Sequence, residues 1–199
     1  MYPNSTDFKQ LMAQAARELT VRGSITFFDN TVATLSSADI ASFTVSESAG
    51  SQMLIGGTSA STVLLRLDNR AGEWEKGGSR LGSRSLDGTL LKLEIGVQGD
   101  SGYIYAPIGE YILEKAVGNE QETTIEIRGA DALANKTDKV FFDDETKYPR
   151  TIKAILADVC ERAGITAKTQ IFANENVSIA TMPQWQGASC RDIIGYIAA

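Results

Sequence analysis

The chain has no histidine among its 199 residues. This absence excludes His-dependent catalytic triads, imidazole metal ligands and imidazole pH switches, because no other side chain titrates between about pH 5 and 8 without a perturbed pKa. Cysteine is scarce as well: Cys160 and Cys190 lie far apart and form no CxxC motif. This spacing does not favour a zinc or redox pair, so we predict two small buried thiols on helices.

Basic residues are in the minority, since 19 Lys and Arg face 25 Asp and Glu and give a formal charge of -6. A net negative charge is unfavourable for binding the phosphates of a nucleic acid, so we expect no specific nucleic-acid binding. No apolar run approaches the roughly 18 residues that cross a bilayer. The N-terminus also lacks the basic and then apolar layout of a secretory signal. The sequence predicts a soluble protein made in the cytosol, without membrane insertion.

Motifs of known catalytic chemistry are missing too: we find no phosphate-binding glycine loop, dinucleotide fingerprint, Gly-x-Ser-x-Gly elbow or calcium loop. Asp143, Asp144 and Glu145 could supply oxygen ligands or an acid-base pair. Adjacent carboxylates just before a helix are, however, typical of a solvated loop. No nucleophile has a base beside it. We therefore predict that the chain is not an enzyme and expect no catalytic residue, cofactor or metal.

What the sequence does contain is a series of short β-rich runs between Gly23 and Gly129. Their alternation of apolar and polar residues puts one face of each strand in a core. The first two runs flank Asp29-Asn30, a hairpin turn in which Asn tolerates positive φ. The runs lie at residues 24–28, 31–35, 42–47, 52–55, 61–67, 90–97, 109–115 and 123–128. Eight short strands predict a closed or nearly closed β-barrel, which would leave no exposed strand edge.

Residues 70–87 interrupt this series of β-rich runs and contain seven charged residues and four scattered glycines. A connection this long without periodicity is typical of a functional or a disordered loop. Two interpretations stay open: a loop that orders against an acidic neighbouring subunit, with Trp74 and Leu81 as anchors, or a mobile solvated hairpin. For the first, the candidate assembly-interface residues are Arg70, Trp74, Lys76, Arg80, Leu81 and Arg84.

Helical spacing marks both ends of the chain. Apolar residues from Phe8 to Leu19 predict a helix over residues 7–19, which either closes one end of the barrel or docks on a neighbouring subunit. Asp7 and Gln10 resemble its capping box. A stronger helix follows Thr151 as N-cap and ends at Gly164.

The region after residue 129 is predicted to be helical and mixed. One or two turns are expected at residues 130–134, and short strands at 171–172 and 177–180. A last helix begins near Ser189, and its apolar pattern still runs at Ala199, so we expect the chain to be cut inside a helix. We predict an N-terminal helix or arm at residues 1–20, the barrel at 21–129 and the mixed region at 130–199.

Degenerate segments in a fixed order span nearly the whole chain. They are MYP at 1–3, RGSIT at 22–26, FTVSE at 43–47, IGGT at 55–58, LLRLDN at 64–69, LLKLEIGV at 90–97, APIGEY at 106–111, IRGADAL at 127–133, YPRT at 148–151 and SCRDIIGYIA at 189–198. This order resembles the N-terminal portion of phage and prophage tail hub proteins. That family includes baseplate hubs and the tail-tip or tail-associated proteins.

The resemblance implies a tail-tube-like β-barrel followed by part of a helical and mixed insertion domain. It also implies a virion structural protein, made in the bacterial host cytoplasm, that assembles as a homotrimer in the tail. Its partners would be further copies of itself, a neighbouring tail-tube or distal-tail ring, and tip or spike proteins.

Two alternatives stay open. One is a hexameric tail-tube or distal-tail ring protein. The other is a β-barrel module of a cell-wall-binding or hydrolytic protein, in which exposed aromatic rings would stack on sugars. The candidate rings are those of Trp74, Tyr103, Tyr105 and Trp185.

Overall fold

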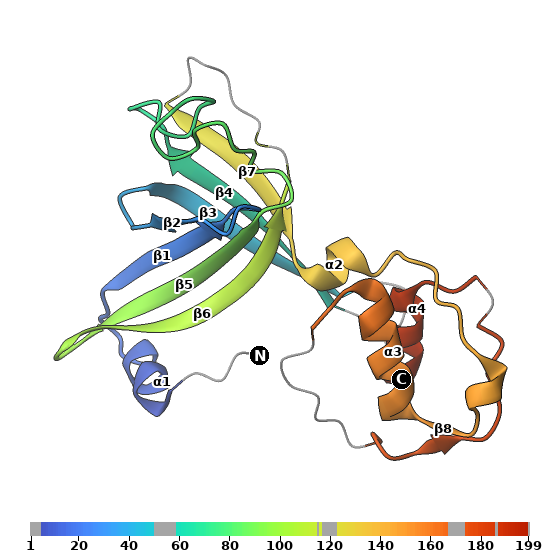
Figure 1. The fold of residues 1–199 in the computed structure, drawn as a ribbon. Helices are drawn as coiled ribbons and strands as arrows, with labels where there is room; N and C mark the ends of the chain where they lie inside the picture. The colour runs from blue at the N-terminus through green and yellow to red at the C-terminus, as the bar shows by residue number, and fades with distance from the viewer. Residues whose placement is uncertain are drawn as a thin grey trace. The chain divides into compact units, whose positions relative to one another are not determined.

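The structure is a computed structural model, which describes residues 5–49, 59–114, 116, 123–166, 174–185 and 187–198. Contacts divide the chain into two compact units (Figure 1). Unit 1 comprises Met1–Ser46 and Thr62–Asp131, and unit 2 comprises Glu47–Ser61 and Ala132–Ala199. Each unit has an apolar core of its own, and we describe the units separately.

Unit 1 is built on a seven-stranded antiparallel sheet, so the chain is mainly β, as predicted. In space, the strands follow the order β2-β1-β5-β6-β7-β4-β3. Their bounds are β1 (Leu19–Thr26), β2 (Val32–Leu35), β3 (Ile40–Ala49), β4 (Ser59–Asp68), β5 (Leu90–Gly99), β6 (Gly102–Leu113) and β7 (Thr124–Ala130).

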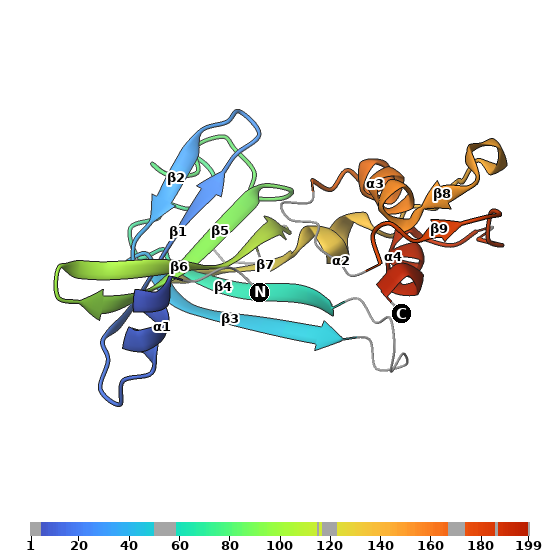
Figure 2. The ribbon, with the colours of Figure 1, turned by 90° about the horizontal axis from the view of Figure 1, so that it is seen from below.

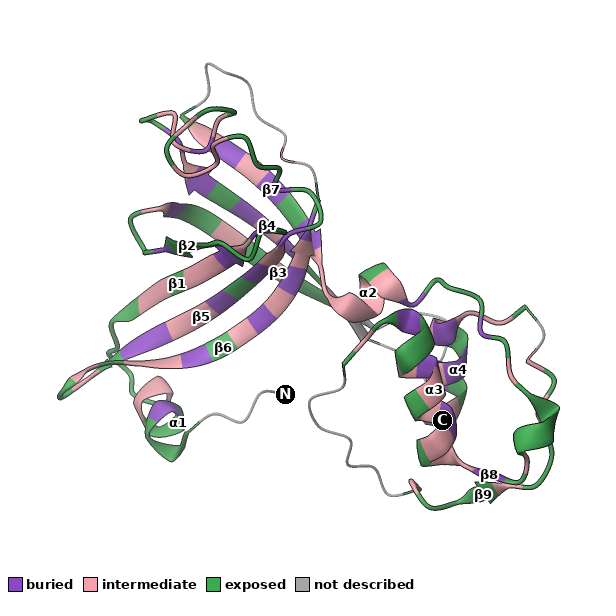
Figure 3. Cartoon of the chain, in the orientation of Figure 1, coloured by how far each residue is buried: buried purple, intermediate pink, exposed green. Residues whose placement is uncertain are grey.

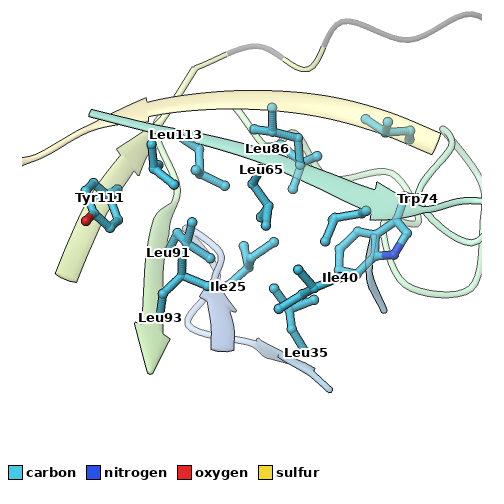
Figure 4. Close-up of a cluster of buried hydrophobic side chains, with 14 of the residues drawn as sticks. Ile25, Leu35, Ile40, Leu65, Trp74, Leu86, Leu91, Leu93, Tyr111 and Leu113 are labelled. Atoms are coloured by element: carbon cyan, nitrogen blue, oxygen red, sulfur yellow. The ribbon is translucent and has the colours of Figure 1, made fainter. Parts of the chain in front are cut away.

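The prediction of a closed barrel is wrong, because β2 and β3 lie at opposite borders of the sheet and do not pair with each other. They follow each other in the chain, joined by a tight turn in which Asp39 accepts hydrogen bonds from the N–H and hydroxyl of Ser36. Side chains occupy the interior between these borders: Leu35 and Ile40 are buried in the same cluster as Trp74 (Figure 4). The sheet therefore does not close into a barrel, and apolar side chains fill the space between its two borders.

The β1–β2 hairpin is confirmed, and Asn30 adopts the predicted positive φ of 63°. β6 is longer than the run predicted at residues 109–115, since it begins at Gly102 and forms a hairpin with β5. Pro107 lies inside β6, where the register shifts between Leu93 and Glu94. A bulge is one of the few places where a strand accepts proline. The expected run at residues 52–55 lies outside the described residues.

Helix α1 (Thr6–Met12) is shorter than the predicted helix, and its N-cap is Ser5, whose hydroxyl accepts from the N–H of Phe8. Just after the helix, Arg17 donates to the backbone oxygens of Met12 and Gln14. Phe8 is buried against β5 and β6. The helix therefore covers part of its own sheet, although the sheet is not the closed barrel whose end the first of the two interpretations expected it to close.

Unit 2 contains α2 (Ala132–Lys136), a short 3-10 helix η1 (Glu145–Lys147), β8 (Arg150–Thr151), α3 (Ile152–Ala163), β9 (Ser178–Ile179) and α4 (Cys190–Ala198). The predicted caps of α3 are confirmed: the Thr151 hydroxyl accepts from the N–H of Ala154, and Gly164 is left-handed at φ 72°. Figure 3 shows buried positions recurring along α3 and α4. Ile155 and Ile193 are fully buried in this core.

Candidate functional site

The 69–89 loop, which is the whole connection between β4 and β5, is folded onto unit 1. The side-chain amide of Asn69 donates to Glu75 at 2.9 Å, and its oxygen accepts from the Trp74 N–H at 3.0 Å. Trp74 itself is only 1% exposed and belongs to the main core (Figure 4). Its side chain is therefore unavailable to a neighbouring subunit, which corrects the anchor role expected for it.

The loop doubles back on itself at Gly78. A Cβ there would lie 2.2 Å from the backbone oxygen of Gly72 and 2.6 Å from that of Glu73, so only glycine fits. Leu81 and Leu86 then pack against the main core, Leu86 buried and Leu81 partly so. The loop is an ordered part of the unit, and the alternative of a mobile hairpin does not describe it.

Arg80 connects the loop to the strand at one border of the sheet. Its guanidinium donates to the backbone oxygen of Thr34 on β2 at 2.8 Å and pairs with Asp39 at 2.7 Å and Glu73 at 3.0 Å. At Thr34, the loop thus covers the outer border of β2, which is the strand at this end of the sheet.

The other loop cations lie nearer the surface. Arg84 pairs with Asp29 at 2.8 Å in the β1–β2 turn, and Arg70 pairs with Asp68 next to it in the chain. Hydrogen bonds from Thr31 and then from Arg84 lower the pKa of Asp29 to about 2. Lys76 is exposed. An assembly role for these surface cations stays a prediction.

The remaining borders of the sheet differ in how they are protected. Along β6, the described strands pair with β7 only at Ile112 and Leu113, and the rest of β6 contains Pro107 beside a bulge. Proline, bulges and covering elements are common ways to blunt a strand edge. Among the described residues, nothing pairs with the outer border of β3 along residues 40–46 (Figure 2).

The composition of β3 leaves this border open. From Ile40 to Ala49 the strand reads IASFTVSESA, with no proline or lysine and with Glu47 as its one charge. Phe43 and Val45 pack toward the core, while Ser42 and Thr44 are exposed on the other face. A long edge strand without such protection is a template for pairing with another chain. Sequence reasoning missed this feature, because it expected a closed barrel.

The aromatic residues considered for sugar stacking are partly occupied. Trp74 is buried, and the guanidinium carbon of Arg22 lies 3.6 Å from the ring centroid of Tyr105. Tyr103 donates to Glu18 at 2.5 Å. Trp185 lies in unit 2, where its ring is 6.2 Å from that of Phe141. Trp74 thus has no free face for stacking, and one face of Tyr105 is covered by Arg22.

In unit 2, Asp143 is not part of a solvated loop. Its side chain is 5% exposed, pairs with buried Arg150 at 3.1 Å and accepts a hydrogen bond from the Tyr148 hydroxyl. Arg150 also pairs with Asp158 at 2.7 Å, and Lys147 pairs with Asp158 at 3.2 Å. Two carboxylates and two cations therefore balance each other, and Asp143 serves this network.

The neighbouring carboxylates are placed differently. Asp144 is exposed and caps η1 by accepting from the N–H of Thr146, and Glu145 is exposed. Within the described residues, no group of three or more acidic or cysteine side chains is placed to hold a metal ion.

Two hollows in unit 2 share Phe141 and Phe142. The first has a volume of about 350 Å³, and its other apolar lining residues are Met182, Pro183 and Trp185. The second has a volume of about 400 Å³, and its polar lining residues are Lys147, Asp158, Glu161 and Arg162. Phe141 is buried, whereas Phe142 is 76% exposed at the boundary between the hollows.

Both cysteines are free thiols on helices, Cys160 half-buried on α3 and Cys190 buried on α4. Burial raises the pKa of both thiols. In the described part of the chain, no helix combines the length and apolar character needed to cross a membrane. Comparison with protein-family models and with curated proteins finds no match to this chain.

Proposed function

We propose that the chain is a structural, non-enzymatic component of a phage or prophage tail. In this proposal it forms the hub or tail-tip ring that joins the tail tube to the tip or spike. The observation that carries the proposal is the unprotected border of β3, beside two borders that are covered or interrupted. The resemblance of the ordered sequence segments to tail hub proteins supplies the threefold symmetry.

The sheet is suited to lateral assembly. A ring of identical subunits needs a heterologous contact, in which one patch of a subunit meets a different patch of the next copy. Main-chain hydrogen bonds along β3 give such a contact affinity without a catalytic pocket, and its alternating side chains fix the register. Because the border of β2 is covered at Thr34, the border of β3 is one half of this contact, and the other half is a different surface of the next copy.

The symmetry of the assembly tests the proposal. Native mass spectrometry and cryo-electron microscopy of the chain should show threefold rings. A stable monomer throughout the micromolar range would count against the proposal. A sixfold ring would favour the hexameric tail-tube or distal-tail alternative.

A further inference from the structure

The first hollow of unit 2 is suited to an apolar side chain. Among the described residues that line it, Asp143 carries the only charged side chain. That carboxylate is already paired with Arg150 and accepts a hydrogen bond from the Tyr148 hydroxyl, so it is not free to hold a polar ligand. An apolar group that enters the hollow removes the rings of Phe142 and Trp185 from water, which is favourable.

Phe142 presents such an apolar group at the boundary of this hollow. Its ring is 76% exposed and lines both hollows. The guanidinium carbon of Arg162 lies 5.6 Å from the ring centroid, and the Arg162 Nε donates to the backbone oxygen of Val140 at 3.3 Å. The cation is therefore held beside the ring. The same surface thus carries an exposed apolar ring next to a hollow that accepts one.

The second hollow carries two charges of each sign. Its cations are Lys147 and Arg162, and its carboxylates are Asp158 and Glu161. Lys147 and Asp158 pair with each other at 3.2 Å. Glu161 and Arg162 are exposed neighbours on α3, and neither forms an ion pair in the part of the chain that the structure describes. The surface that complements this one therefore offers a cation and a carboxylate beside an apolar ring, because a partner of one sign would be repelled by one of the two groups.

Those three groups are the ones that this surface itself presents. We propose that the two hollows of unit 2 bind the same surface of a second copy of the chain across a two-fold axis. Phe142 of each copy enters the apolar hollow of the other beside Trp185, and Arg162 of each copy pairs with Glu161 of the other. A two-fold contact is the arrangement in which one surface meets itself. This contact uses unit 2 alone and does not depend on ring assembly through β3.

Sedimentation equilibrium of the full chain measures this contact when pairing through β3 is suppressed. The Thr44→Lys variant supplies that background, because lysine on an edge strand opposes pairing with another strand. In it we expect a reversible monomer–dimer equilibrium between about 1 µM and 1 mM. Adding Phe142→Ser should weaken dimerisation by at least about tenfold. Phe28→Ser is the matched control and should leave it within about twofold, because Phe28 is also 76% exposed but belongs to unit 1.

Charge reversal in the same background tests which groups meet across the axis. Glu161→Arg and Arg162→Glu should each weaken dimerisation by at least about tenfold, because like charges then face each other. An equimolar mixture of the two variants should regain the parent's affinity within about threefold, since opposite charges face each other again in the mixed dimer. A monomer throughout the concentration range, or undiminished dimerisation by the Phe142→Ser variant, would overturn the contact. A mixture that associates no more tightly than either variant alone would overturn the pairing of Glu161 with Arg162.

Discussion

At the residue scale, Arg150 is a buried cation that forms ion pairs with two carboxylates. Its side chain is 7% exposed, and its partners are the carboxylates of Asp143 and Asp158 and the backbone oxygen of Ala154. Taking such a charge out of water is costly unless every donor finds a partner. The network therefore fixes the packing of η1, β8 and α3 more than it adds net stability.

Removing one partner of this network should reveal that cost. Arg150→Met leaves Asp143 buried without its cation, and we expect unit 2 to lose about 3–5 kcal/mol of unfolding free energy. Lys153→Met is the control, because it breaks an exposed pair with Glu175 and should cost less than about 1 kcal/mol. Urea denaturation of both variants measures the difference. Equal losses would show that the buried network is not special.

Tyr148 gives unit 2 a dependence on alkaline pH. Burial, followed by the hydrogen bond to Asp143, raises the pKa of its hydroxyl above the ordinary value of 10.0. Because the folded state holds this proton more tightly than the unfolded state, the contribution to stability is complete below about pH 10 and is lost as the pH rises further. Ultraviolet titration of the six tyrosines should show a late phase that shrinks in Tyr148→Phe. An unchanged late phase would contradict this assignment.

At the scale of elements, the 69–89 loop acts as part of the core of unit 1. Trp74→Ala should destabilise unit 1 by about 3–5 kcal/mol, because it empties a fully buried site. Trp74→Phe should cost less, since the buried Trp74 Nε1 has no hydrogen-bond partner among the described residues, so removing it leaves no acceptor without a donor there. Thermal unfolding of the two variants tests the order. If both were neutral, the loop would not support the fold.

Local rules explain which elements could be predicted from the sequence. The positive φ of Asn30, the N-cap Thr151 and the left-handed Gly164 depend on neighbouring residues alone, and all three are confirmed. Pro107 concealed the first half of β6, because a proline in a strand is accepted only where a bulge or an edge allows it. Pairing of β2 with β3 depends on contacts across the whole sheet, which no local pattern specifies.

The candidate site was predictable only in part, for the same reason. The sequence singled out the loop cations and Trp74, but not that the tryptophan turns inward while Arg80 binds Thr34 and Asp39. One missed signal was available: Ser189 and Asp192 cap the start of α4 reciprocally, at the spacing of a capping box.

At the scale of the whole molecule, two separate cores predict two units that unfold separately. Ile155 is fully buried, with 0% of its surface exposed, in the core of unit 2. Ile155→Asp places an unpaired charge there, so unit 2 should unfold while unit 1 persists. In NMR spectra the Trp185 indole signal should move to its unfolded position and that of Trp74 should stay. Loss of both signals together would show a single cooperative molecule.

The central claim is that the border of β3, which has no pairing strand among the described residues, meets a different surface of the next copy in a ring, and a matched pair of lysine variants tests it most directly. Thr44 is exposed on the edge strand β3, and Thr62 is exposed on β4, which has a strand on each side. Lysine on an edge strand opposes pairing with another strand. In native mass spectrometry, Thr44→Lys should weaken ring formation by at least about tenfold, and Thr62→Lys should leave it within about twofold of the parent. Rings that persist unchanged in a folded Thr44→Lys variant would contradict the account.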